Sequence, residues 1–256
     1  MTLPSPPLAA KLLEKHCVAL AQALAWIPSI VEPAAIVATG SIIRGNPGPS
    51  SDLDLVVLHD QPWRRRVQRW FNDTPVEIFF NSEQWLKHSI QTEAATGRPV
   101  MAHMLATGTL LQDDAGRMEA LQDLSRNLLE RGPNLTHEAL QRHRYAAATQ
   151  VEDALDFGDI DNPDARRLRA VAVEGLLQYE YLRRNTHLPR PKERLALLSQ
   201  SAPDLAGLLA SALYAATAEP AAAALQKAAE QVLGTAGFFE WDSGPDHSEP
   251  DGRHAS

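Results

Sequence analysis

The stretch IVATGSIIRGNPGPSSDLDLVVLHD, residues 36–60, and the shorter PVEIFF, residues 75–80, decide how the chain is organised. Asp52 and Asp54 stand at the start of an apolar run, and because side chains alternate across a strand, they project from the same face. Glu77 lies inside the second apolar run, and an adjacent strand could bring it beside them. Because buried, unpaired carboxylates cost several kcal/mol or more, we expect a cation among these acids.

The chemistry of this acidic group favours magnesium. Its ligands are hard carboxylate oxygens without His or Cys nearby, and such ligands suit magnesium better than zinc or copper. Two ions could bridge a triphosphate and an attacking hydroxyl. Gly40 and Ser41 supply the phosphate side. A glycine at a strand end lets the backbone approach a phosphate, and the serine offers an N–H and a hydroxyl at the start of a helix.

A Gly-Ser pair, an Asp-x-Asp ten residues later and a distant strand acid together resemble the nucleotidyltransferase superfamily. That superfamily includes DNA polymerase beta and the aminoglycoside nucleotidyltransferases. The resemblance implies that Gly40 and Ser41 hold the nucleotide phosphates. It also implies that Asp52, Asp54 and Glu77 bind the metals, and that Glu77 either ligates the catalytic metal or helps to deprotonate the acceptor. The implied fold is α+β, a small mixed sheet flanked by helices and followed by an all-α helical bundle.

Three further residues are candidates for the site. Arg44 borders the Gly- and Pro-rich loop and could meet a phosphate, although a solvated loop arginine is an equal alternative. Residues 172–195, AVEGLLQYEYLRRNTHLPRPKERL, resemble the long helix and Pro-Lys segment of aminoglycoside-type adenylyltransferases. On that likeness Lys192 reaches the triphosphate and Glu174 binds or activates the acceptor. The alternative for both is an ordinary solvated side chain on a helix.

The segment after the Asp-x-Asp strand carries an unusual mixture of tryptophan and arginine. We expect Pro62 to begin a helix that buries Trp63, Val67, Trp70 and Phe71 on one face. The solvent side then carries the arginines at positions 64, 65, 66 and 69. A nucleic-acid patch is the alternative to this solvated arginine face, and we favour the solvated face because the tryptophans are needed for the core and not for stacking on bases.

The composition changes after Gly132-Pro133, from segments with β-branched runs to segments rich in Ala and Leu with helical periodicity. We therefore expect a domain boundary here, with a helical bundle domain over residues 134–236. The resemblance implies that residues 1–133 form the nucleotidyltransferase catalytic domain. The polar, Pro- and Gly-containing residues 237–256 are expected to form a disordered tail.

Charge and cysteine content limit the partners and the compartment. The formal net charge of the 256 residues is −8, which argues against a nucleic-acid partner and would tolerate a cationic substrate. The single cysteine, Cys17, excludes an intrachain disulfide and suits a reducing cytoplasm. We expect a cytoplasmic protein with neither a signal peptide nor a membrane span, and a homodimer is compatible with the sequence.

Together with these observations, the resemblance implies a magnesium-dependent nucleotidyltransferase that uses two ions. It would move a nucleoside monophosphate, AMP from ATP, onto a hydroxyl of a small molecule such as an aminoglycoside, and release pyrophosphate. Two alternatives stay open. One is an antitoxin-type enzyme that adenylylates a protein, and the other is a nucleotide-binding module without catalysis.

Overall fold

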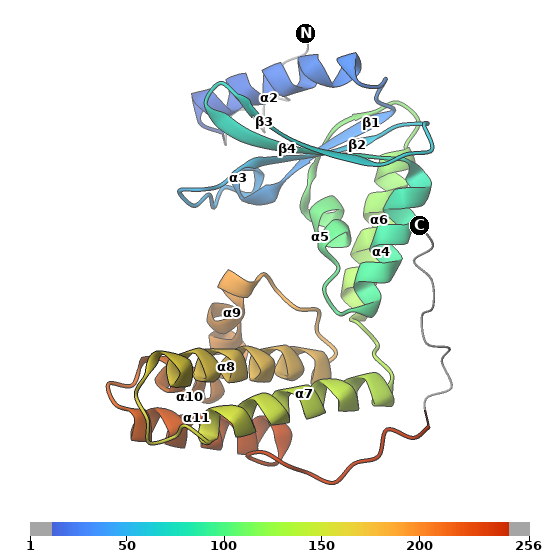
Figure 1. The fold of residues 1–256 in the computed structure, drawn as a ribbon. Helices are drawn as coiled ribbons and strands as arrows, with labels where there is room; N and C mark the ends of the chain where they lie inside the picture. Colours follow the sequence, from blue (N-terminus) through green and yellow to red (C-terminus); the bar gives the residue numbers. More distant parts are fainter. Residues whose placement is uncertain (1–11, 246–256) are drawn as a thin grey trace, which may run out of the picture. The chain divides into compact units, whose positions relative to one another are not determined.

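The computed structural model describes residues 12–245, which fall into two compact units with their boundary between Pro133 and Asn134 (Figure 1). Each unit has its own hydrophobic core. The N-terminal unit contains a sheet and helices, and the C-terminal unit contains helices alone among the described residues. The predicted α+β class is therefore confirmed.

The N-terminal unit is built on one mixed, five-stranded sheet with the strand order β3-β4-β2-β1-β5. Only β2 and β4 pair in parallel, and the other neighbours are antiparallel. The strands are β1 (Ala35–Thr39), β2 (Leu53–Leu58), β3 (Arg65–Phe71), β4 (Thr74–Asn81) and β5 (Thr109–Asp113).

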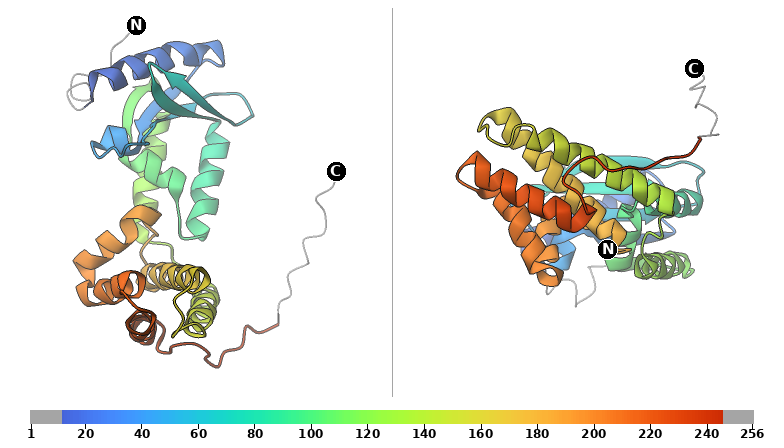
Figure 2. Two further views of the ribbon diagram at one scale, coloured as in Figure 1. Left: turned by 60° about the vertical axis from the view of Figure 1, so that its left-hand side comes forward. Right: turned by 90° about the horizontal axis from the view of Figure 1, so that it is seen from below.

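Helices cover both faces of this sheet, which explains why its central strands are almost uniformly apolar (Figures 1 and 2). One face, with Ile36 and Leu55, packs against α2 (Glu14–Trp26). The other face, with Val37 and Val56, packs against three helices. They are α4 (Glu83–Ala95), α5 (Val100–Thr107) and α6 (Arg117–Arg131). Two short segments, η1 (Ile27–Ser29) and α3 (Gly40–Arg44), flank β1.

The helix predicted from Pro62 is wrong: residues 65–71 form the edge strand β3, which makes an antiparallel hairpin with β4. Asn72 and Asp73 connect the two strands with φ angles of 44° and 54°. Two successive positive φ angles are typical of the tight turns whose twist matches that of a β-hairpin. Trp70 is 69% exposed, so it does not belong to the core that the helix required.

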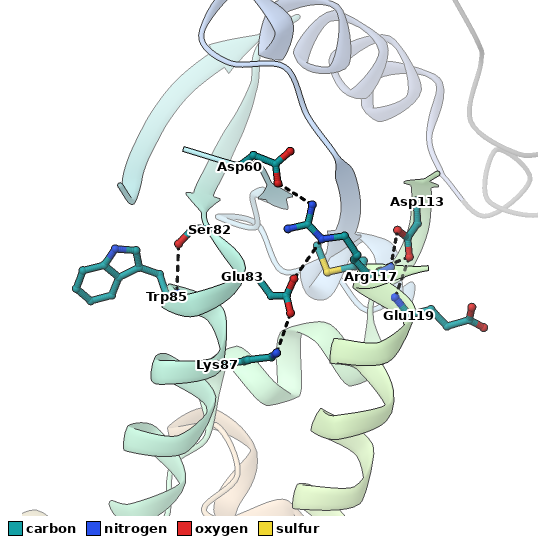
Figure 3. Close-up of polar contacts among 9 residues, drawn as sticks. Asp60, Ser82, Glu83, Trp85, Lys87, Asp113, Arg117 and Glu119 are labelled. Atoms are coloured by element: carbon teal, nitrogen blue, oxygen red, sulfur yellow. Dashed lines mark hydrogen bonds and ion pairs between the residues drawn. The ribbon is translucent and has the colours of Figure 1, made fainter. Parts of the chain in front are cut away.

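Arg117, at the start of α6, forms ion pairs with the segment that follows β2 and with α4 (Figure 3). Its Nη1 lies 2.7 Å from Asp60 Oδ1, just beyond the C-terminal end of β2, and its Nε lies 3.1 Å from Glu83 Oε2 on α4. Glu83 Oε1 accepts a hydrogen bond of 2.7 Å from Lys87. The carboxylate of Asp113, at the end of β5, accepts three backbone N–H groups at 2.9–3.0 Å and so caps α6.

The C-terminal unit packs its helices around an Ala- and Leu-rich core. They are α7 (His137–Leu155), α8 (Pro163–Arg183), η2 (Pro191–Glu193), α9 (Arg194–Ser201), α10 (Pro203–Tyr214) and α11 (Ala218–Leu233). Thr136 and Asn162 cap α7 and α8 with their side chains, at 3.2 and 2.8 Å. No helix within residues 12–245 combines the length and the apolar character needed to cross a membrane.

Part of the predicted tail is described. Residues 237–245 contain neither helix nor strand, yet Phe239 packs against the helical core and the ring centroid of Trp241 lies 5.2 Å from that of Tyr145 on α7. Residues 246–256 lie outside the described residues.

Candidate functional site

The three carboxylates singled out in the sequence lie together on one face of the sheet. Asp54 on β2 and Glu77 on β4 stand directly opposite each other in the parallel register. Asp52 precedes β2 by one residue and, by alternation, shares that face. Oxygen atoms from all three side chains lie within 4.8 Å of one another. Glu77 is buried, whereas Asp52 and Asp54 are half-buried.

This donor set fits a divalent metal ion. Three carboxylates that converge at one point supply only hard oxygen ligands, which suits magnesium. Three protein ligands also leave coordination positions for phosphate oxygens and water, as magnesium sites bound to nucleotides require. Asp52, Asp54 and Glu77 are the residues that would hold the ion.

Gly40, the first residue of α3, lies against this acidic group. Its φ angle is +90°, in the region that favours glycine. A Cβ atom at this position would lie 2.3 Å from Asp54 Oδ2, much closer than two such atoms can approach. The absence of a side chain at position 40 therefore leaves the room that the Asp54 carboxylate occupies.

Ser41 connects the Gly-Ser turn to the loop that leads into Asp52. Its buried hydroxyl lies 2.7 Å from the hydroxyl of Ser51, which in turn accepts a 2.8 Å hydrogen bond from the backbone N–H of Gly48. Arg44 is half-buried at the C-terminal end of the same short helix. The structure thus brings Gly40, Ser41 and the Asp-x-Asp pair together through β1 and β2, which are hydrogen-bonded neighbours.

Two site residues on β3 were missed because residues 62–71 were expected to be helical. Arg66 Nε pairs with Glu77 Oε1, and Gln68 Nε2 donates to the same oxygen at 3.1 Å. The hydrogen bond to Glu77 is the main cause that raises the pKa of Arg66, and the charges of Asp54 and Asp52 add to it. The signal that could have found them is Asn72-Asp73: a hairpin at that point places Gln68 opposite Glu77.

Glu174 and Lys192 belong to the C-terminal unit. Glu174, on α8, pairs with the buried Arg194 and accepts a 3.0 Å hydrogen bond from Gln178. It also lines a pocket of about 380 Å³ between α7 and α8, together with His143 and Gln150. Lys192 is exposed in η2.

Comparisons with known proteins agree with this architecture. Residues 19–103 match the family model described as a nucleotidyltransferase domain. Among solved structures, a nucleotidyltransferase-like protein from Exiguobacterium sibiricum superposes with a TM-score of 0.51 at 17% sequence identity, over 84% of this chain and 73% of that chain. At that identity the likeness concerns the fold alone. No curated protein sequence matches the chain.

Proposed function

Since the chain belongs, through residues 19–103, to the nucleotidyltransferase superfamily and is a transferase, we propose that it moves AMP from ATP onto a hydroxyl of a small molecule such as an aminoglycoside. Transfer of a nucleoside monophosphate in general follows from the family. Our proposal adds the choice of nucleotide, the metal, the acceptor and the roles of individual residues. The observation that carries it is the convergence of Asp52, Asp54 and Glu77 within 4.8 Å on one sheet face.

The proposed reaction is a single displacement at phosphorus. The acceptor hydroxyl oxygen forms a bond to the α-phosphorus, the bond between that phosphorus and the oxygen bridging to the β-phosphate breaks, and pyrophosphate leaves with the bonding electrons. Such chemistry depends on positioning and on charge neutralisation more than on covalent help from the protein. Magnesium, when bound, would supply that neutralisation at the attacking and leaving oxygens.

The residues of the N-terminal unit divide the remaining work. Asp52 and Asp54 would hold the ions, two of them in our proposal, and Glu77 would either ligate the catalytic ion or take the proton from the acceptor hydroxyl. Gly40 and Ser41 would bind the β/γ end of the triphosphate. The close approach of Gly40 to Asp54 supports this division, because it brings the proposed phosphate and metal ligands into contact.

Arg44 and Lys192 are proposed as further phosphate ligands, and Glu174 as an acceptor ligand. The pocket beside Glu174 supports its assignment, because polar side chains, among them His143, Gln150 and Arg167, line it together with small apolar residues. Arg194 balances the charge of Glu174, so the pocket offers an oriented carboxylate within an ion pair. The oxygens of that carboxylate can accept hydrogen bonds from the hydroxyls of an acceptor.

The test is a screen of the full chain with Mg²⁺, each of the four ribonucleoside triphosphates and a panel of aminoglycosides. Pyrophosphate release is measured together with the mass gain of the acceptor. AMP on an aminoglycoside supports the proposal, and AMP on a protein in an added lysate supports the protein-adenylylating alternative. Nucleotide binding without pyrophosphate release in either assay would identify a module without catalysis.

A further inference from the structure

The acidic group contains its own cation. Arg66 lies on the edge strand β3 with 63% of its side chain exposed, and its Nε reaches inward to Glu77, of which only 8% is exposed. Gln68, two residues along the same face, donates to the same Glu77 oxygen at 3.1 Å. One Glu77 oxygen atom thus receives two hydrogen bonds from the protein.

We propose that Arg66 is a built-in counter-ion that occupies Glu77 in the nucleotide-free protein and opposes binding of a metal ion by itself. The site would then admit the metal efficiently only together with the nucleotide. This inference rests on the proposed function, because it takes Asp52, Asp54 and Glu77 as the metal ligands. Arg66 would thereby set the order in which the metal ion and the nucleotide bind.

Electrostatics supports this role. Asp54 and Asp52, as well as Glu77, stabilise the positive charge of Arg66, so the guanidinium interacts with the whole acidic group. A charge-assisted hydrogen bond to a buried carboxylate is stronger than one between neutral groups. A divalent ion that approaches Glu77 must therefore compete with a cation already placed there, and like charges repel at this range.

The nucleotide changes this balance. A triphosphate brings several negative charges, which attract both the metal and the guanidinium. With the triphosphate present, the site can accommodate both cations without a large excess of positive charge. Arg66 is well placed for such an exchange, because its side chain is largely exposed on the edge strand β3, and within residues 12–245 no further strand pairs with the outer side of β3.

The experiment measures Mn²⁺ binding to the nucleotide-free full chain by titration calorimetry. We compare the wild type with Arg66→Gln and with the control Arg65→Gln, which removes an exposed arginine from the opposite face of β3. R66Q should bind Mn²⁺ about fivefold more tightly than the wild type, or better, and R65Q should equal the wild type. Structural damage would weaken metal binding, so a gain in affinity cannot arise from it.

A second readout follows thermal stability. Without metal, R66Q should melt at a lower temperature than the wild type, because the carboxylates lose their counter-ion, and Mn²⁺ should raise its melting temperature more than that of the wild type. Arg66→Lys, which keeps the charge, should lie between the two in Mn²⁺ affinity.

If R66Q binds Mn²⁺ no more tightly than the wild type, including no binding by either, the Arg66 inference is overturned. The metal site itself is judged separately, from the affinity for a nonhydrolysable ATP analogue with Mn²⁺ present. Asp54→Asn should reduce that affinity in both the wild-type and R66Q backgrounds. An unchanged affinity would refute the metal assignment and leave the proposed function without its main support.

Discussion

Gly40 and Asp54 are in contact across the space that a side chain at position 40 would fill: a Cβ atom there would lie 2.3 Å from Asp54 Oδ2. The two residues come from different elements, the start of α3 and the strand β2. The glycine of the Gly-Ser pair and the second aspartate of Asp-x-Asp thus form one packed unit, although the rest of α3 and the following loop separate them along the chain.

Gly40→Ala should therefore disable the site. The added methyl group must displace the Asp54 carboxylate, so we expect nucleotidyl transfer to fall by about 100-fold or more. Gly45→Ala is the matched control. Gly45 has a similar φ angle of +81°, but no heavy atom lies within 4 Å of the place that an added methyl group would take, so G45A carries the backbone strain without the collision. An equal loss of activity in the two variants would show that Gly40 matters only for its φ angle.

Asp54→Asn should abolish turnover while the fold survives. If Asp54 holds a metal ion as proposed, its loss removes several kcal/mol of transition-state stabilisation, or a factor of about 100 or more in the rate. Removal of one of three clustered negative charges relieves repulsion, so the melting temperature without metal should stay the same or rise. The control is Asp60→Asn, beyond the other end of β2, which should keep its activity. Full pyrophosphate release by D54N would contradict the metal assignment.

Ser41→Ala should raise the KM for ATP by about three- to tenfold, the usual value of one hydrogen bond, if its hydroxyl binds the triphosphate. Ser51→Ala separates this role from bracing of the loop. It removes the hydroxyl that lies 2.7 Å from Ser41 and leaves Ser41 itself in place. We expect a smaller change in KM for S51A than for S41A. Equal changes would mean that Ser41 acts only by holding the loop.

Glu83→Gln should change how stability depends on pH. The hydrogen bond from Lys87 is the main cause that holds the pKa of Glu83 below its ordinary value, and the hydrogen bond from Arg117 adds to it. A lowered carboxyl pKa stabilises the fold above the unfolded-state pKa, and this stabilisation is lost as the pH falls through the folded-state value. The wild type should exceed E83Q in unfolding free energy by less than about 1 kcal/mol at neutral pH, because the pair is partly exposed.

Urea unfolding at several pH values checks this prediction. The difference between the wild type and E83Q should shrink toward zero as the pH falls below the range in which Glu83 titrates. Glu119→Gln, which removes an exposed carboxylate in the first turn of α6, near Arg117, serves as the control (Figure 3). A wild-type advantage that grows on acidification would contradict the assigned sign.

The acidic group could be foreseen in the sequence because its spacing follows the period of a strand. Asp52 and Asp54 are two residues apart, which alone places them on one face, and Glu77 interrupts an apolar run that only a strand pairing would explain. The caps of α7 and α8 obey a similarly local rule, because Thr136 and Asn162 are residue types that favour the position before a helix.

The role of β3 could not be foreseen from hydrophobic pattern alone. Val67 and Phe71 are four residues apart, which fits one face of a helix and also one face of a strand. The turn distinguishes the two structures, because Asn72 and Asp73 adopt positive φ angles and reverse the chain into a hairpin. Arg66 and Gln68 became part of the site only through that reversal.

Asp54 and Glu77 stand directly opposite each other on neighbouring parallel strands. The site is therefore sensitive to whether the number of residues inserted or deleted in either strand is odd or even. Insertion or deletion of a single residue within the strand β4, ahead of Glu77, would turn its carboxylate toward the α2 side, whereas a change of two residues would preserve its orientation. Natural length variation in this hairpin should therefore be tolerated in even steps and eliminated in odd ones.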